Sequence, residues 1–299
     1  RNRQFDKAFV DMDRYVALLP KEPNPQDSYG ELLRMAGRFE QSLLHYRAAL
    51  KLDPDFVTSQ LGLGDTYALM GNQEQARIEY ERAVRYAHNE ADRLSYSMQS
   101  AMTWVRDGKF SEADKAFAEF AEIAATAHAK DQDLQEAQAF RHMAEYQADD
   151  NVALKYLKQA QEALSHRDIV MSDKDEELSH ILRNRVVRAA RAGDQALADK
   201  SLQQLEAMAT GSRNRVILCS YNGAAGTLLM DQKKFEDAIA RLEEDQDNPF
   251  TMELLVQAYY ETGATDKLHE IEGKLRGTNL PTMEQALVVP AMRSSRPII

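Results

Sequence analysis

Identical residues that recur 34 positions apart constrain this chain more than any other feature of its sequence. Six pairs share the spacing: Phe5 and Phe39, Pro20 and Pro54, Gly30 and Gly64, Gly37 and Gly71, Tyr46 and Tyr80, and Ala49 and Ala83. Self-similarity with a period of roughly 20 to 50 residues is typical of proteins built from stacked structural units. One such unit cannot bury its apolar face alone, so we expect neighbouring units to stack.

Helix-breaking residues are scarce in the middle of the chain. No proline occurs between Pro54 and Pro249, and neither proline nor glycine occurs between Gly108 and Gly193. Strong helix formers dominate this stretch, and the alternating β-branched segments of strands are missing. Apolar residues recur three or four positions apart, which indicates short amphipathic helices. The chain is therefore predicted to be all-α, with about fifteen or sixteen helices.

The repeated residues resemble the tetratricopeptide repeat (TPR) family. Two consecutive units carry the resemblance, through Tyr29, Gly30, Gly37, Tyr46, Ala49, Leu50 and Pro54 in the first and Gly64, Asp65, Thr66, Tyr67, Gly71, Ala76, Tyr80 and Ala83 in the second. It implies a right-handed α-α superhelix, or solenoid, of helical hairpins of the kind found in bacterial TPR arrays. Small residues would let paired helices approach closely, and tyrosines would fill the space between pairs.

The resemblance weakens along the chain, and the spacing lengthens; Ala113 and Ala153, for example, are 40 residues apart. The first helix of the first repeat is missing, so we expect the chain to be cut from a longer protein. We expect a single solenoid over residues 1–299, with the best-matching repeats at 3–90, longer divergent repeats at 91–276, a capping helix at 281–293 and a tail at 294–299.

Charge and hydropathy exclude several classes of function. The 299 residues include 48 acidic and 37 basic side chains, a formal net charge of −11. This charge disfavours binding to nucleic acid or to an anionic membrane. The mean hydropathy is −0.56, and no apolar run approaches the ~20 residues of a membrane span. These features favour a cytoplasmic location without deciding it, and the oligomeric state stays open.

Catalytic and metal-binding motifs are missing from the sequence. It has no phosphate-binding loop, no nucleophile elbow and no zinc-protease motif. Gly62-Leu63-Gly64 lies inside a helical repeat rather than after a strand, the seven histidines are scattered, and the single Cys219 excludes a cysteine-built metal site. We therefore expect no catalysis, no cofactor and no metal.

The resemblance implies a concave surface lined by the first helix of each hairpin, and this surface is the expected binding site for a protein or peptide. Its predicted lining is acidic at one end, apolar in the middle and basic at the other end: Asp27, Glu31, Arg34, Leu61, Asp65, Met98, Met102, His142, Tyr146, Arg183, Asn184 and Arg191. Met98, Met102 and Tyr146 are the expected apolar anchors, since methionine adapts to varied partners.

Some TPR proteins hold the C-terminal carboxylate of a partner with a clamp of lysine and asparagine. The matching positions here carry Asp27, Glu31, Leu61 and Asp65. Three acidic side chains would repel a carboxylate, so the sequence excludes this clamp.

The sequence thus predicts a non-catalytic scaffold that binds a protein or peptide. The alternative is a sensor module of a larger signalling protein, with a kinase or DNA-binding effector domain upstream of residue 1. The residues that precede Arg1 would discriminate between the two, because an effector domain would be visible there.

Overall fold

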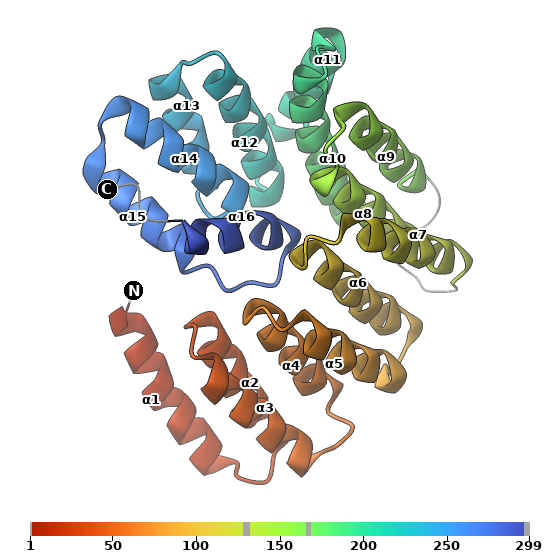
Figure 1. Ribbon diagram of the computed structural model, residues 1–299, viewed down its shortest axis with the longest axis vertical. Coiled ribbons are helices and arrows are strands. Elements are labelled where there is room, and N and C mark those ends of the chain that lie inside the picture. The colour runs from red at the N-terminus through yellow and green to blue at the C-terminus, as the bar shows by residue number, and fades with distance from the viewer. Residues whose placement is uncertain (1, 128–131, 166–168, 296–299) are drawn as a thin grey trace. The chain divides into compact units, whose positions relative to one another are not determined.

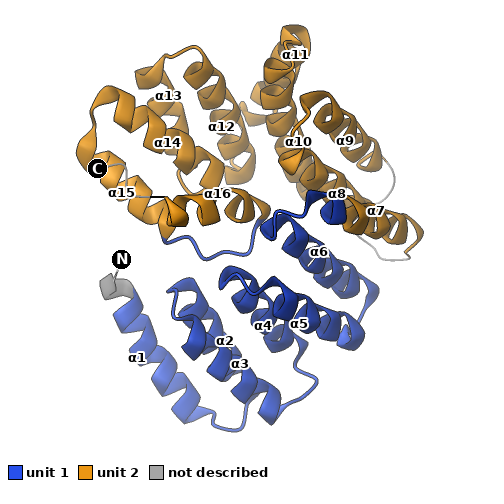
Figure 2. Cartoon of the chain, in the orientation of Figure 1, with its two compact units in different colours: residues 1–113, 277–282 blue, residues 114–276, 283–299 orange. Residues whose placement is uncertain are grey.

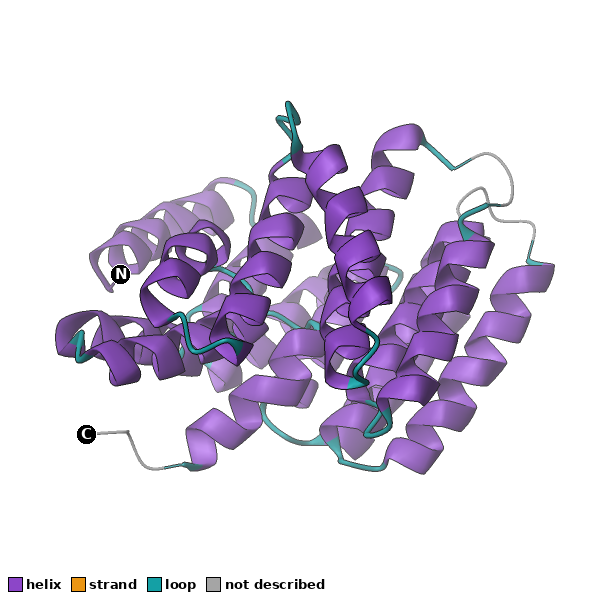
Figure 3. Ribbon diagram, turned by 90° about the horizontal axis from the view of Figure 1, so that it is seen from above, coloured by secondary structure: helices purple, strands orange, loops and turns teal. Residues whose placement is uncertain are grey.

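The chain is helical throughout the part that the structure describes. A computed structural model describes residues 2–127, 132–165 and 169–295. In these ranges it contains sixteen α-helices, one short 3-10 helix and no strand (Figure 1, Figure 3). The all-α prediction is therefore confirmed.

The helices follow one another with short connections. Their bounds are α1 (Asn2–Leu18), α2 (Pro23–Met35), α3 (Phe39–Leu52), α4 (Val57–Leu69), α5 (Gln73–Tyr86), α6 (Glu90–Arg106), α7 (Phe110–Thr126), α8 (Gln132–Tyr146), α9 (Asp150–Ala163), α10 (Met171–Arg191), α11 (Gln195–Ala209), α12 (Arg215–Asp231), α13 (Phe235–Leu242), η1 (Glu243–Asp245), α14 (Pro249–Thr262), α15 (Thr265–Arg276) and α16 (Met283–Ser294).

The helices divide into two compact units (Figure 2). Unit 1 comprises residues 1–113 and 277–282, and unit 2 comprises residues 114–276 and 283–299. Unit 1 thus contains both 34-residue repeats and α6, while the rest of the longer repeats falls in unit 2. A single solenoid over residues 1–299 stays a prediction.

Consecutive helices pack as hairpins within each unit. The hairpins are α2 with α3 and α4 with α5 in unit 1, and α8 with α9, α10 with α11, α12 with α13 and α14 with α15 in unit 2. First helices also contact the first helices of neighbouring hairpins. We call this side of each unit its first-helix face; it consists of α2, α4 and α6 in unit 1, and of α8, α10, α12 and α14 in unit 2.

Two glycines of α4 allow tyrosines of second helices to pack against its backbone. A Cβ atom at Gly62 would lie 2.3 Å from the ring of Tyr46, and one at Gly64 would lie 2.6 Å from the ring of Tyr80. Both rings are buried, so a larger residue at either glycine would have to displace a packed side chain. The predicted close approach at Gly64 is confirmed, and Gly62 has the same role toward the preceding hairpin.

Glycine also ends the first helix of both 34-residue repeats. Gly37 follows α2 with a φ of 76°, and Gly71 follows α4 with a φ of 87°. This left-handed conformation suits glycine because it has no Cβ atom. The predicted role of these two glycines in the turns is therefore confirmed.

The C-terminal segment differs from the sequence prediction. Residues 277–282 have no helical structure and pack with unit 1, so the predicted capping helix begins at Met283 rather than at residue 281. In unit 2, α16 packs on α14 and α15 with Val288 and Val289 in their core, and it also contacts α8. Residues 296–299 of the predicted tail lie outside the described residues.

Candidate functional site

The twelve side chains that the sequence predicts as binding residues all lie on first helices. Asp27, Glu31 and Arg34 belong to α2, Leu61 and Asp65 to α4, Met98 and Met102 to α6, His142 and Tyr146 to α8, and Arg183, Asn184 and Arg191 to α10. The structure therefore divides them between the first-helix faces of the two units.

A pocket of about 130 Å³ opens on the first-helix face of unit 2. Four helices contribute to its wall: α8 with Glu145, α10 with Arg183, Asn184, Val187, Arg188 and Arg191, α12 with Thr227, and α14 with Phe250, Glu253 and Leu254. Three of the predicted residues, Arg183, Asn184 and Arg191, meet in this pocket. It combines charged and amide groups with the apolar side chains of Val187, Phe250 and Leu254, the usual mixture of a binding site.

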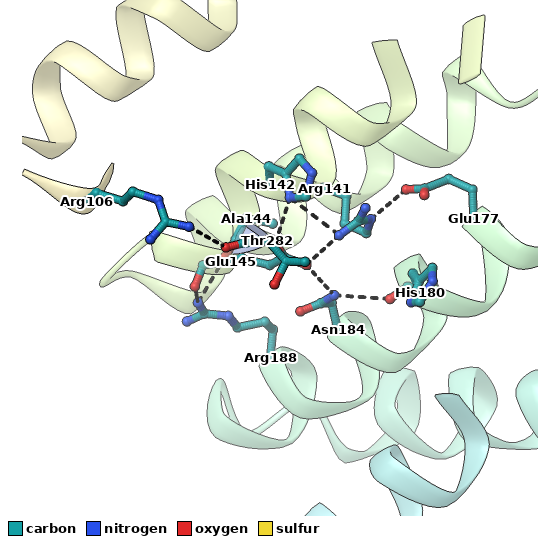
Figure 4. A network of polar contacts seen from close by, with 10 residues as sticks. All are labelled: Arg106, Arg141, His142, Ala144, Glu145, Glu177, His180, Asn184, Arg188 and Thr282. Carbon is teal, nitrogen blue, oxygen red and sulfur yellow. Dashed lines mark hydrogen bonds and ion pairs between the residues drawn. The ribbon is translucent and has the colours of Figure 1, made fainter. Parts of the chain in front are cut away.

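Buried charges on α8 and α10 hold one wall of the pocket in place (Figure 4). Arg141 donates to Glu177 (Nε–Oε1 2.6 Å) and to Glu145 (Nη1–Oε1 2.7 Å). Glu145 also accepts from the amide of Asn184 (3.2 Å) and lies 2.9 Å from Nδ1 of His142. The side chains of all five residues are thereby fixed, so the predicted residues His142 and Asn184 belong to one network.

The protonation states follow from this geometry. Burial alone would raise the pKa of Glu145, but Arg141 and His142 outweigh it and lower the pKa to about 2. Burial, together with the positive charges of Arg141 and Arg183, lowers the pKa of His180 to about 3. At neutral pH the pocket therefore has an ionised Glu145 and a neutral His180 close to its wall.

Two arginines of α10 act as structural cross-links. Arg183 donates to Asp245 (2.7 Å) and to the Thr251 hydroxyl (2.6 Å). Arg188 donates to Asp150 (2.7 Å) and to the backbone carbonyls of Ala144 and Glu145 (2.9 Å each), which end α8. The charges of both arginines are thus balanced within the protein.

The third arginine, Arg191, is the predicted basic residue that is exposed. Among residues 2–127, 132–165 and 169–295, Arg191 forms no ion pair. Burial raises the pKa of Glu253 across the pocket, and the charge of Arg191 opposes this shift. Of the two arginines predicted at the basic end of the binding surface, Arg191 is therefore the one that a partner can reach, because Arg183 is buried in an ion pair with Asp245.

The predicted apolar anchors are wrong for this structure. Met98 and Met102 are 7% and 3% exposed, and Tyr146 is 8% exposed with its hydroxyl donating to Asp114 (2.9 Å). Apolar side chains four positions apart on a helix form one stripe, and here that stripe packs inside the protein. These three residues therefore offer little accessible surface to a partner.

In unit 1 the predicted residues form a polar cluster. Arg34 is buried, with Asp65 at 3.8 Å and Glu31 at 3.7 Å, and Tyr80 donates to Asp65 (2.8 Å). Burial raises the pKa of Asp65, although Arg34 opposes this shift. The cluster holds α2 and α4 together, and of these residues Glu31 is exposed.

The other two predicted residues of unit 1 also have internal contacts. Asp27 is half-buried and accepts from the Ser59 hydroxyl (2.6 Å), which links α2 to α4. Leu61 is half-buried and packs between two small core clusters around Ala76 and Ala83.

Comparison with known proteins identifies the repeat. A family model for the TPR repeat matches residues 30–71. Residues 30–71 form a TPR repeat. The match begins at Gly30 and ends at Gly71, and so includes the residues of α4 that pack against Tyr46 and Tyr80.

Solved structures show that the same fold extends beyond the matched repeat. A TPR protein from Parabacteroides merdae is 12% identical with a TM-score of 0.53, and the alignment covers 86% of this chain and 93% of that chain. BtubC (BKLC) from P. vanneervenii is 18% identical with a TM-score of 0.50, covering 70% of this chain and 91% of that chain. At these identities the likeness shows the fold alone. No curated protein matches the chain.

The part of the chain that the structure describes offers neither a metal site nor a membrane span. No group of three or more His, Cys, Asp or Glu side chains there could hold a metal ion. None of the described helices is long and apolar enough to cross a membrane. His128 and His166 lie outside the described residues.

Proposed function

We propose that this chain is a non-catalytic TPR scaffold that binds a protein or peptide segment in the pocket on the first-helix face of unit 2. The observation that carries the proposal is the convergence of four first helices on one pocket. TPR domains generally bind proteins or peptides, and the pocket gives this general property a location.

The size of the pocket favours a peptide side chain as its occupant. Pockets for drug-sized molecules have volumes of about 300–1,000 Å³, whereas this one has about 130 Å³. It can enclose one side chain of a partner whose remaining residues lie on the surrounding helices. A partner of this kind binds through several shallow contacts and one inserted anchor.

The lining favours an apolar side chain as that anchor. Arg183, Arg188 and Glu145 are each balanced by a partner within the protein. Val187, Phe250 and Leu254 then supply the apolar wall, while Arg191 and Glu253 are exposed at the rim. Burial of apolar area would supply most of the affinity, and the rim charges would orient the partner.

Selection of displayed random peptides against the 299-residue chain tests this proposal. Binding of the selected peptides is then measured for Val187→Glu, which places a charge in the pocket wall, and for Arg191→Glu, which reverses the rim charge. We expect the first change to weaken binding at least tenfold and the second about threefold, since a rim charge contributes little.

Two matched substitutions on other helices of unit 2 serve as controls. Ile123 is 46% exposed on α7, and Lys200 is exposed on α11. Ile123→Glu and Lys200→Glu introduce the same charges away from the pocket and should leave binding unchanged. If pocket and control variants bind alike while helical content is preserved, the pocket is not the binding site.

A further inference from the structure

Residues Gly277–Thr282 cross the first-helix face of unit 1 as a non-helical segment between α15 and α16, which we call the strap. Arg34 of α2 donates to the carbonyl of Asn279 (3.4 Å), and Arg106 of α6 donates to the carbonyl of Thr282 (3.2 Å). The Asn279 amide donates to the carbonyl of Met35 at the end of α2 (3.2 Å). The face thus binds the strap largely through its backbone, in the way that it would bind an extended peptide.

We propose that the strap occupies a peptide-binding site on unit 1, and that an extended, uncharged segment of a partner displaces it. The proposal rests on the proposed function, peptide binding by the first-helix faces. It adds a second binding site, on unit 1, and specifies the chemistry of the segment that binds there. It also makes the strap a competitor that limits access of a partner to this site.

The charges around Arg34 indicate an uncharged ligand. Glu31 and Asp65 lie 3.7 and 3.8 Å from the Arg34 guanidinium and already balance its charge. A neutral carbonyl can accept a further hydrogen bond from this arginine, whereas a carboxylate on the partner would meet two like charges. The strap matches this requirement, since Gly-Thr-Asn-Leu-Pro-Thr has no charged side chain.

The two arginines also set a spacing for the ligand. They bind the carbonyls of residues 279 and 282, three positions apart and at most about 10 Å in an extended chain. A side chain with an amide group, like that of Asn279, can reach the Met35 carbonyl next to the first of these positions. The expected ligand is therefore an extended stretch with an asparagine or glutamine followed three residues later by a free carbonyl.

The strap can leave this site without unfolding its neighbours. Leu280 at its centre is 46% exposed, while Thr278 and Asn279 are 9% and 8% exposed and would become accessible when the strap leaves. Met283 at the start of α16 is fully buried. On the other side, Arg276 ends α15 and is bonded to Glu272 and to the end of α16. Both flanking helices thus stay anchored in unit 2 while the six residues between them move, which is the pattern of a local opening.

A spin label on the strap tests this exchange in the 299-residue chain. The label is attached to Leu280→Cys in a Cys219→Ser background, and the probe is a synthetic capped peptide with the uncharged sequence of residues 277–282. We expect the label to become more mobile as the peptide is added. The same label on Leu44→Cys, at a position of α3 that is 64% exposed, should not respond. A strap label that stays unchanged at millimolar peptide overturns the proposal, because the tethered strap has an effective concentration on the millimolar scale.

Two substitutions with different expected effects exclude a general loss of structure. Asn279→Ala weakens the strap but leaves the site intact, so a fluorescein-labelled form of the peptide should bind about fivefold to tenfold more tightly. Arg106→Gln removes a contact that the strap and the added peptide both make, so the apparent affinity of the peptide should change little. No gain for Asn279→Ala, or an equal gain in both variants with helical content preserved, would show that the strap is not a competitor.

A third variant separates this proposal from the proposed function. Arg191→Glu alters the pocket of unit 2 and should leave binding of the strap peptide to unit 1 unchanged. If the strap peptide does not bind while selected peptides still depend on Val187 and Arg191, the strap proposal fails and the pocket of unit 2 stands.

Discussion

Unit 1 and unit 2 both contain buried arginine pairs, such as Arg34 with Asp65 in unit 1, but they rely on them to different degrees. In unit 1, glycines of α4 receive the rings of Tyr46 and Tyr80, and small buried residues such as Ala76 complete the contact. In unit 2, buried arginines join first helices to one another, as Arg141 does with Glu177 of α10 and Arg183 with Thr251 of α14. Helices can thus be joined by shape or by buried charge, and the two solutions differ in what they require of the sequence.

Packing by shape requires glycine, alanine and tyrosine at regular positions, which explains why the repeat can be recognised in the sequence of unit 1. Packing by charge places polar residues at buried positions, where they interrupt the apolar spacing that identifies a helix face. Gly223 illustrates the difference: a Cβ atom there would lie 2.6 Å from the Arg183 guanidinium, so this glycine makes room for a charge rather than for a ring.

Breaking the charge network of unit 2 should have the largest effect on stability. Arg141→Met removes the cation and leaves Glu145 and Glu177 buried side by side, which should cost about 3–5 kcal/mol. Hydrogen exchange measured by mass spectrometry would show the loss of protection in α8 and α10. Arg93→Met in unit 1 is the comparison, because its pair with Glu90 is exposed and should contribute about 0–1 kcal/mol. Equal losses would show that the Arg141 network is not the stabilising element of unit 2.

Overpacking a contact of unit 1 should have a smaller effect. Ala76 is fully buried on α5, close to Ala68 and Tyr80, so Ala76→Leu should cost about 1–3 kcal/mol. Chemical denaturation measures the change, with Glu74→Leu at an exposed position of the same helix as the control. A loss no greater than that of the control would mean that α4 and α5 are not in tight contact at this position.

Acid should weaken unit 2 through His180. Because burial and nearby arginines lower its folded pKa to about 3, below its unfolded value of about 6.5, the unfolded chain binds more protons between these values. Stability should therefore fall as the pH decreases from about 6.5, by on the order of 1–2 kcal/mol at pH 5. Below about pH 4.5 the ionised Glu145, whose folded pKa is about 2, adds a second loss. His180→Asn should remove the first loss and leave the second, as followed by denaturation at a series of pH values.

The sequence predicts the fold well and the site in part. The spacing of Gly30, Gly37, Gly64 and Gly71 fixes the register of two repeats, and this register places the predicted residues on first helices. Arg183, Asn184 and Arg191 meet in one pocket because they lie on one helix, α10, at positions that face the same way. These features depend on local periodicity, which a sequence displays directly.

Other parts of the site depend on contacts between distant residues. Arg34 and Asn279 are 245 positions apart, and nothing in the local pattern of either segment indicates that they meet. Met98 and Met102 of α6 would have the same spacing whether they packed inside the protein or faced a partner. Their spacing in the sequence therefore could not predict whether they are buried. The contributions of Thr227 and Phe250 to the pocket were missed because the repeat is too weak in α12 and α14 to fix their register.

The smallest expected effect is the salt dependence of partner binding, and it sharpens the contrast between buried and exposed charge within unit 2. Of the three arginines that line the pocket, Arg183 and Arg188 are held in short ion pairs of 2.7 Å, whereas Arg191 is exposed.

Raising the ionic strength from about 0.01 M to 0.15 M shortens the screening distance from about 30 Å to 8 Å. Selected peptides that contact the rim should therefore bind about twofold to threefold more weakly, as a rim charge contributes less than about 1 kcal/mol. Arg191→Gln should abolish this salt dependence, which titration calorimetry at both ionic strengths can measure. If the variant keeps the full salt dependence, the charge that orients the partner is not that of Arg191.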